Sequence, residues 1–172
     1  MTLGWAIRAA GEDDLDALSI VASATFVETF AGVLSGEAVV RHCIRANSVD
    51  AYRCYLDDGA RAWLAEVDPG KAPVGFALMT APDLPTARAG DVELKRIYLL
   101  SRFHGGGIGA ALMAQAIAAA HGFERLLLGV YAGNARAIAF YAKNGFKPIA
   151  TRQYDIGGTL YDDIVLARPL AA

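Results

Sequence analysis

The feature that most constrains this chain is an apolar run followed by a glycine cluster and a helix-forming segment. Residues Asp91 to Leu100 suit a buried strand, although Lys95-Arg96 interrupts the alternation and predicts a bulge or a splayed end. Four of the five residues from Gly105 to Gly109 are glycine, and only Gln115 is polar from Ile108 to Ala120. The pattern predicts a strand, a glycine-rich turn and a helix that is buried on most of its surface.

This order of elements is typical of a site for a phosphate group. Glycine lets the backbone approach a ligand closely, and it adopts positive φ angles at little cost. The unpaired N–H groups at the start of a helix attract an anion. A pyrophosphate site is therefore predicted, while a glycine cluster can also be no more than a tight turn.

Two common nucleotide-binding loops fit less well. A P-loop requires Lys followed by Ser or Thr after its last glycine, and here Ala110-Ala111 follows. A dinucleotide-binding loop is harder to dismiss, because Gly105, Gly107 and Ala110 satisfy its spacing and Glu124 could bind a ribose. That loop normally follows the first strand of a long βαβ series directly, whereas here Ser101 to His104 intervene.

Composition and length narrow the class of protein further. A chain of 172 residues that is 55% apolar is long enough for one well-packed domain, so residues 1–172 are predicted to form a single domain. A net charge of −2 argues against a nucleic-acid or anionic membrane surface. With no evident signal peptide or apolar span, and with Cys43 and Cys54 expected to be reduced, we expect a cytoplasmic protein without a metal.

The order of the predicted elements indicates an α/β fold with a mixed sheet. Gly157-Gly158 is typical of a hairpin between the last two strands. The strands are expected at Trp5–Ala9, Ala60–Val67, Pro73–Thr80, Asp91–Leu100, Glu124–Tyr131, Lys147–Asp155 and Thr159–Ala167. The helices are expected near Gly11–Phe30, Ser35–Ala46, Val49–Asp58, Ile108–Ala120 and Ala135–Asn144.

The glycine-rich segment resembles a motif of a known family. Residues His104-Gly105-Gly106-Gly107-Ile108-Gly109 are similar to the acetyl-coenzyme A-binding motif of the GCN5-related N-acetyltransferases (GNAT), Arg/Gln-x-x-Gly-x-Gly/Ala. The resemblance implies that these six residues bind the cofactor, mostly through backbone amides. His104 departs from the Arg or Gln that the family prefers.

A second segment also resembles the family. Residues Asn134 to Phe146 are similar to its motif of Asn followed by Ala-Ile-x-Phe-Tyr-x-Lys-x-Gly-Phe. The resemblance implies that Asn134 and Ala137 contact the cofactor and that Tyr141, also at the cofactor, is the general acid for the departing thiolate. Without the family, Tyr141 is simply an aromatic residue of a helix that packs on a sheet.

The resemblance assigns further roles along the central strand. Ile97, Tyr98 and Leu99 match the positions where the family's splayed strand pairs with the pantetheine arm, and the N–H of Leu99 would hold the polarised carbonyl. Glu93 matches a glutamate that removes the amine's proton directly or through water; otherwise it is an exposed strand acid. The implied fold is a mostly antiparallel sheet with a splayed middle strand, flanked by helices.

The acceptor is predicted less directly. Phe26, Glu28 and Phe30 are candidates for the wall of a substrate pocket that also includes Glu93, although core packing explains the two phenylalanines equally well. A cationic acceptor would suit the acids if they converge; these are Glu28, Glu93, Asp155, Asp162 and Asp163.

The segment from Glu93 to Leu99, with Thr25-Phe26 to Phe30 upstream, resembles the branch of the family that includes bacterial polyamine acetyltransferases, so we expect a small primary amine or a polyamine. A protein N-terminus or lysine is the second possibility. Two other classes of protein also stay open: a non-catalytic module that binds acetyl-coenzyme A, and a nicotinamide-binding protein. A homodimer through the C-terminal hairpin is possible.

Overall fold

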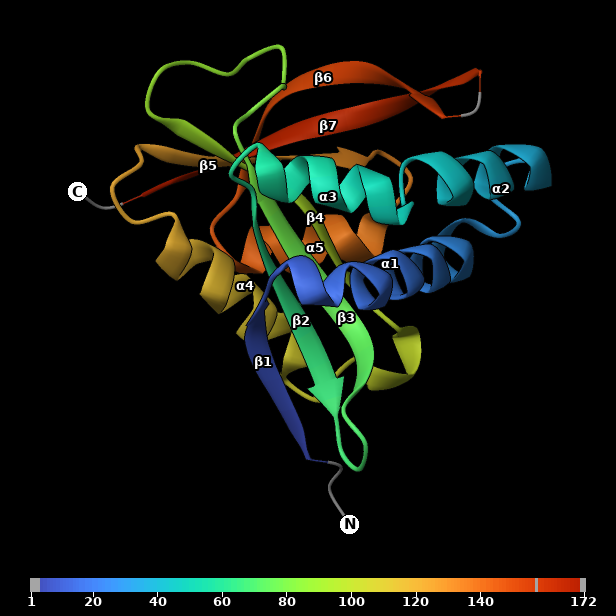
Figure 1. Ribbon diagram of the computed structural model, residues 1–172. Helices are drawn as coiled ribbons and strands as arrows, with labels where there is room; N and C mark the ends of the chain where they lie inside the picture. The colour runs from blue at the N-terminus through green and yellow to red at the C-terminus, as the bar shows by residue number, and fades with distance from the viewer. Residues whose placement is uncertain (1–3, 157, 171–172) are drawn as a thin grey trace.

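Seven strands form one sheet in the order β1-β2-β3-β4-β5-β7-β6 in the computed structural model, which describes residues 4–156 and 158–170 (Figure 1). Adjacent strands are antiparallel except β4 and β5, which are parallel. The strands are β1 (Trp5–Ala10), β2 (Arg61–Val67), β3 (Ala72–Thr80), β4 (Asp91–Leu99), β5 (Arg125–Tyr131), β6 (Lys147–Ile156) and β7 (Thr159–Pro169). The predicted mixed α/β fold is confirmed.

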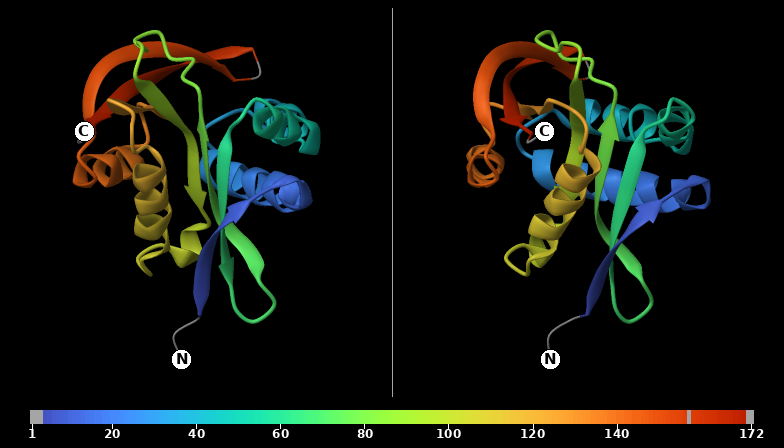
Figure 2. Two further views of the ribbon diagram at one scale, coloured as in Figure 1. Left: turned by 60° about the vertical axis from the view of Figure 1, so that its left-hand side comes forward. Right: turned by 90° about the vertical axis from the view of Figure 1, so that its left-hand side faces the viewer.

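Helices cover both faces of the sheet (Figure 2). α1 and α3 pack on one face with side chains of β2 and β3, and α4 and α5 pack on the other. The helices are α1 (Leu15–Phe30), α2 (Gly36–Arg45), α3 (Val49–Asp57), α4 (Ile108–Ala119) and α5 (Ala135–Lys143). Within the described residues, every helix falls short of the length and apolar character that a bilayer crossing requires.

Several helix starts follow directly from the sequence. Ser35 and Ser48 accept hydrogen bonds from Ala38 N and Ala51 N, as residues at a helix N-cap do. The first helix begins differently from the prediction, because Glu12–Asp14 forms a short 3-10 turn before α1. Gly157 of the predicted hairpin lies outside the described residues, and Gly158 has a φ of 90°.

The helix α4 corrects one expectation. Its buried face consists of Ile108, Leu112, Met113 and Ala116, while Ala110, Ala114, Gln115 and Ala118 are exposed. The helix is therefore buried along one face rather than on most of its surface. Alanine favours a helix without requiring burial, so a pattern that counts alanine as apolar overestimates the buried area.

The sheet opens between β4 and β5. These strands pair only at Asp91, Val92 and Glu93, after which β4 continues along β3 and β5 continues along β7. The β3–β4 register shifts by one residue at Lys95, which is the bulge that the sequence predicts. Beyond Glu93, the edge of β4 that faces β5 has no neighbouring strand among the described residues.

Candidate active site

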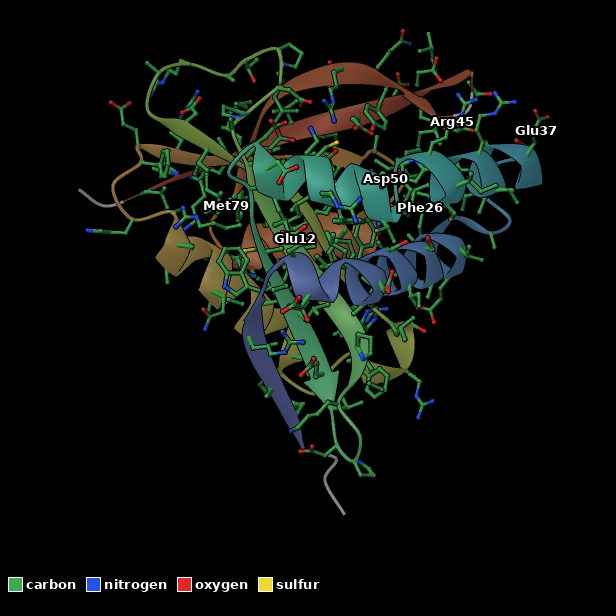
Figure 3. All side chains as sticks on the ribbon, in the orientation of Figure 1. Glu12, Phe26, Glu37, Arg45, Asp50 and Met79 are labelled. Carbon is green, nitrogen blue, oxygen red and sulfur yellow. The ribbon has the colours of Figure 1, made fainter. Side chains whose placement is uncertain are left out.

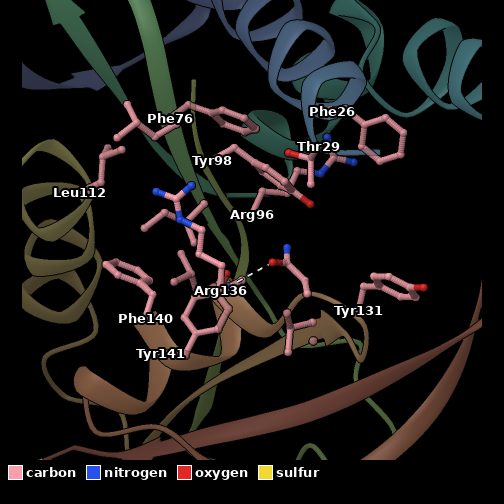
Figure 4. Close-up of a pocket in the computed structure, with 18 of the residues that line it drawn as sticks. Phe26, Thr29, Phe76, Arg96, Tyr98, Leu112, Tyr131, Arg136, Phe140 and Tyr141 are labelled. Carbon is pink, nitrogen blue, oxygen red and sulfur yellow. Dashed lines mark hydrogen bonds between the residues drawn. The ribbon is translucent and has the colours of Figure 1, made fainter. Parts of the chain in front are cut away.

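A cavity of about 830 Å³ lies where β4 and β5 diverge. Its lining comes from both faces of the sheet, with Phe26, Thr29 and Arg96 on one side and Leu112 and Phe140 on the other (Figure 4). Cavities where a sheet opens between its strands are common ligand sites. The cavity brings together most residues that the sequence singles out.

The glycine cluster forms one end of this cavity. Gly107 caps the start of α4 with a φ of 86°, and Gly105 has a φ of 83°, a conformation that favours glycine. The N–H groups of the first helical turn have no partners within α4, so they are free to bind an anion. Gly105, Gly107, Gly109 and Ala110 line the cavity.

Two residues of this loop that were predicted to bind the cofactor do not line the cavity. Ile108 is only 3% exposed, and its side chain packs in the core on the face of the sheet that α4 and α5 cover. Only its backbone can therefore bind a ligand. Gly106 is exposed and is absent from the cavity lining. The motif therefore contains both ligand-facing and packing positions.

His104 supports the end of β4. Its Nε2 lies 2.8 Å from the carbonyl oxygen of Leu99, and because a carbonyl only accepts, Nε2 carries the proton. Its Nδ1 is buried and has no hydrogen-bond partner among the described residues. His104 thus holds the turn between β4 and α4, a role that a motif comparison alone does not reveal.

The free edge of β4 lines the cavity. Ile97, Tyr98 and Leu99 all line it, next to the gap that β5 leaves. A backbone edge without a neighbouring strand can pair with an extended ligand, so this edge suits a pantetheine arm. The pKa of Tyr98 is raised to about 12 by burial, and its ring stacks on Phe76 at 6.0 Å.

Tyr141 projects from α5 into the same cavity. Its ring packs edge-on against Phe140 and Phe146, and the residue is 8% exposed. Burial, and secondly the nearby Tyr98, raises the pKa of the Tyr141 phenol, which therefore stays protonated at neutral pH. Tyr141 therefore belongs to the core and also lines the cavity.

Asn134 and Ala137 lie at the start of α5. The Asn134 side chain accepts a hydrogen bond of 3.1 Å from Ala137 N and thereby caps the helix (Figure 4). Both residues line the cavity. The asparagine of the second motif is therefore a structural cap that also borders the ligand space.

Glu93 is a buried acid in the wall of the cavity rather than an exposed strand residue. It is 2% exposed, its Oε2 accepts 2.9 Å from Asp83 N, and its Oε1 lies 3.8 Å from Lys95 Nζ. Burial raises the pKa of its carboxyl above the ordinary value of 4.5. Glu93 lies at the last paired position of β4 and β5, where the gap opens.

The end of α1 supplies an aromatic wall. Phe26 lies between α1 and α2 (Figure 3), where its ring stacks on His42 at 3.9 Å. Phe30 packs edge-on against Tyr131. Glu28 lies at the rim, where it accepts hydrogen bonds from the N–H and hydroxyl of Ser101. All three predicted wall residues of α1 line the cavity, and the two phenylalanines also pack in a core cluster.

The predicted cluster of acids forms only in part. Glu28, Glu93 and Asp163 line the cavity, and Asp155 and Asp162 are absent from its lining. No sequence motif assigns a role to the cations that also line it, which are Lys95, Arg96, Arg136, Lys143 and Arg152. The Lys95-Arg96 interruption of an apolar strand was the feature that could have revealed two of them.

The geometry fits coenzyme A better than a dinucleotide. The free N–H groups at the start of α4 suit a pyrophosphate, and the open edge of β4 suits the extended arm. Glu124, the candidate ribose acid, is absent from the cavity lining and pairs with Arg88 at 3.6 Å. Across the part of the chain that the structure describes, no group of three or more His, Cys, Asp or Glu residues could hold a metal ion.

Comparison with known proteins also points to an enzyme that uses acetyl-coenzyme A. The model of the Acetyltransferase (GNAT) family matches residues 33–146. An uncharacterized N-acetyltransferase of Mycobacterium tuberculosis is 36% identical over 159 residues, which is 91% of this chain and 98% of the relative. A relative in Mycobacterium bovis has the same identity and coverage.

Solved structures share the fold. The PaiA N-acetyltransferase of Thermoplasma acidophilum in complex with coenzyme A has a TM-score of 0.76 at 22% identity, covering 96% of this chain and 99% of that one. The ribosomal-protein-alanine N-acetyltransferase of Brucella melitensis has a TM-score of 0.72 at 28% identity, with the same coverage. This chain therefore belongs to the GNAT family and is an acetyl-coenzyme A-dependent N-acetyltransferase.

Proposed function

We propose that the enzyme acetylates a small primary amine, with Glu93 as the base and Tyr141 as the general acid. The cofactor would lie along Ile97, Tyr98 and Leu99, with its phosphates at the loop from His104 to Gly109 and its remaining contacts at Asn134, Ala137 and Tyr141. The amine would enter from the α1 side, past Phe26, Glu28 and Phe30. The observation that carries this proposal is that the cavity brings Glu93, Tyr141, the free edge of β4 and the glycine loop together.

The proposed roles follow from the environments of the two side chains. Bound acetyl-coenzyme A supplies a thioester whose carbonyl is open to attack by an amine. Glu93 takes the proton that the amine nitrogen loses, directly or through water, as the nitrogen–carbon bond forms. Tyr141 gives its proton to the sulfur as the carbon–sulfur bond breaks, and the N–H of Leu99 holds the carbonyl oxygen.

The charges of the cavity favour a small amine over a long polycation. Three acids and five cations line it, so its field does not select for several positive charges. Glu28 is already bonded to Ser101, and Asp163 pairs with Arg152 at 3.3 Å. The polyamine part of our expectation stays a prediction, and a compact amine is the better-supported acceptor.

A protein N-terminus is the second candidate acceptor. The observation that favours it is the 28% identity with the ribosomal-protein-alanine N-acetyltransferase of Brucella melitensis over 96% of this chain. A peptide ending in alanine, offered next to small amines, separates the two candidates.

Replacing Tyr141 with phenylalanine tests the proposed acid. We expect Tyr141→Phe to lower kcat by about 10²-fold, because general acid catalysis typically contributes this much, while the affinity for coenzyme A stays close to wild type. The measurement is thiol release from acetyl-coenzyme A with a panel of amines, next to calorimetric titration of coenzyme A.

Tyr161→Phe is the matched control, because it also removes one hydroxyl near the sheet but lies outside the cavity lining. It should release thiol at the wild-type rate. Wild-type kcat in Tyr141→Phe would remove Tyr141 from the mechanism.

A further inference from the structure

Arg96 is the partly buried cation of the cavity that has no acidic partner. Among the five cations that line it, Lys95 pairs with Asp83 and Glu93, Arg152 pairs with Asp163, and Arg136 and Lys143 are exposed. Arg96 forms none of the ion pairs found among the described residues. A guanidinium stays charged at every physiological pH. This positive charge therefore has no carboxylate partner among the described residues.

The hydrogen bonds of Arg96 use only one end of its fork. Nη1 donates to Ala46 O at 3.1 Å, Asn47 Oδ1 at 2.8 Å and the Tyr52 hydroxyl at 2.7 Å. Nε and Nη2 have no hydrogen-bond partner among the described residues, and neither atom is fully buried. The anchored Nη1 holds the fork in place, and the other two donors remain available in the cavity.

Arg96 lies in the half of the cavity away from the glycine loop. Its guanidinium lies near Phe26 and Thr29 of α1, whereas Leu112 and Phe140 lie across the cavity (Figure 4). Its anchors come from α3 and the turn between α2 and α3. The proposed function puts the coenzyme A phosphates at the start of α4, so Arg96 is not needed to bind them.

The bulge in β4 places Arg96 on the same face as Glu93. Lys95 is the extra residue, so Glu93 and Arg96 are two regular strand steps apart, about 7 Å along the strand. The Arg96 guanidinium lies over the rings of Tyr52 and Tyr55, 5.4 Å and 5.5 Å from their centroids. Tyr98 is on the same face of β4, where its ring stacks on Phe76. One compact molecule can therefore present an amine to Glu93 and an anion to Arg96.

We infer that the acceptor is a primary amine that carries a carboxylate, such as a free amino acid, and that Arg96 is the residue that selects it. The inference rests on the proposed function and names its substrate class. A carboxylate accepts two parallel hydrogen bonds from a guanidinium, which matches the two free donors Nε and Nη2. It also supplies the missing counter-charge.

The test compares three acceptors that share one side chain: leucine, leucinamide and 3-methylbutylamine. The amine of leucine has a basicity between those of the other two, so a preference for leucine over both cannot arise from amine pKa. We expect wild-type kcat/KM for leucine to exceed both others by about tenfold to a hundredfold. In Arg96→Gln this preference should disappear, mainly through KM.

Two controls separate selection from structural support. Arg45→Gln removes an exposed arginine outside the cavity lining and should keep the preference for leucine. Arg96→Lys should restore part of the preference, because it keeps the charge without the fork. The ratio between acceptors is measured within each sample, so partial unfolding does not change it.

Calorimetry provides a readout that does not depend on turnover. Leucine should bind the wild-type protein saturated with coenzyme A and should bind Arg96→Gln at least about tenfold more weakly, while coenzyme A affinity stays unchanged. Equal use of leucine and leucinamide, an unchanged preference in Arg96→Gln, or weaker coenzyme A binding in that variant would overturn the inference. Acetylation of all amines without preference would leave the proposed function intact, whereas leucine binding without any turnover would overturn only the proposed function.

Discussion

Glu93 and Arg96 show how the surroundings of a residue decide its chemistry. Both belong to β4. Burial of Glu93 in the cavity wall raises the pKa of its carboxyl, while Arg96 stays charged and forms no ion pair among the described residues. A carboxyl with a raised pKa is a better proton acceptor near neutral pH than an ordinary exposed one. In the proposed mechanism, the same strand offers a base and a cation to one small molecule.

The proposed role of Glu93 as the base predicts how activity depends on pH. Because the carboxyl must be ionised to accept a proton, kcat/KM should rise with pH along a limb centred above 4.5, the ordinary pKa of glutamic acid. In Glu93→Gln this limb should vanish and kcat/KM should fall by about 10²-fold. The measurement is the pH profile of kcat/KM between pH 4 and 9, checked for stability at each pH.

Asp163→Asn is the control for that profile. Asp163 is a second acid of the cavity, and burial raises the pKa of its carboxyl as well. The acid limb should remain in this variant if Glu93 is the base. An acid limb that persists in Glu93→Gln and vanishes in Asp163→Asn would assign the proton transfer to Asp163 instead.

The site residues also show what the sequence can predict. Tyr141 and Glu93 were found through motif resemblance, and both line the cavity. The role of Arg96 could not be predicted, because it depends on where Ala46, Asn47 and Tyr52 lie, about 50 positions away along the chain. His104 was singled out as a departure from the motif, but its bond to Leu99 O depends on the fold of the turn.

At the scale of elements, the divergence of β4 from β5 creates the cavity. The two strands are held together at their start by Asp91 and Arg125, with Oδ1 to Nε at 2.8 Å and Oδ2 to Nη2 at 2.7 Å. The Asp91 side chain is fully buried, and Arg125 lowers the pKa of its carboxyl. This bidentate pair fixes the point from which the strands separate.

Removing the charge of Asp91 should destabilise the fold. We expect Asp91→Asn to lower the free energy of unfolding by about 2 to 3 kcal/mol at pH 7, because it leaves a partly buried arginine without its partner. The pKa of Asp91 is depressed, so its contribution is present above the unfolded pKa and is lost as pH falls through the folded pKa. The difference between the two proteins should therefore shrink below about pH 4.

Urea denaturation at several pH values measures this difference. Asp50→Asn is the control, because its pair with Arg53 is on the surface and its side chain is 88% exposed, so stability should change by at most about 0.5 kcal/mol. Equal stability of Asp91→Asn and wild type at pH 7 would show that the ion pair does not hold β4 to β5.

Elements were easier to predict than their surroundings. Apolar runs and caps such as Ser35 and Ser48 located the helices and strands to within a few residues, and the bulge at Lys95 was expected from its break in alternation. The burial of α4 was overestimated, because its outward positions are mostly alanine. Local patterns determine local structure, whereas burial depends on packing partners elsewhere in the chain.

At the scale of the whole molecule, the two faces of the sheet contribute different residues to the cavity. The face with α4 and α5 presents the glycine loop and Tyr141, and the face with α1 and α3 presents the aromatic wall and Arg96. The opening between β4 and β5 is where ligands bound from the two faces can meet. The proposed mechanism therefore requires that both substrates occupy the cavity together and that an acetyl group passes between them.

The stoichiometry of that transfer is the most direct test. Wild-type protein would be incubated with acetyl-coenzyme A and leucine, and free thiol and N-acetylleucine would be quantified in the same samples, by absorbance and by mass spectrometry. The proposed mechanism predicts that both appear at the same rate in a ratio of one to one, and that both fall together in Tyr141→Phe. Thiol release without an acetylated amine, for leucine and for every other amine offered, would contradict it.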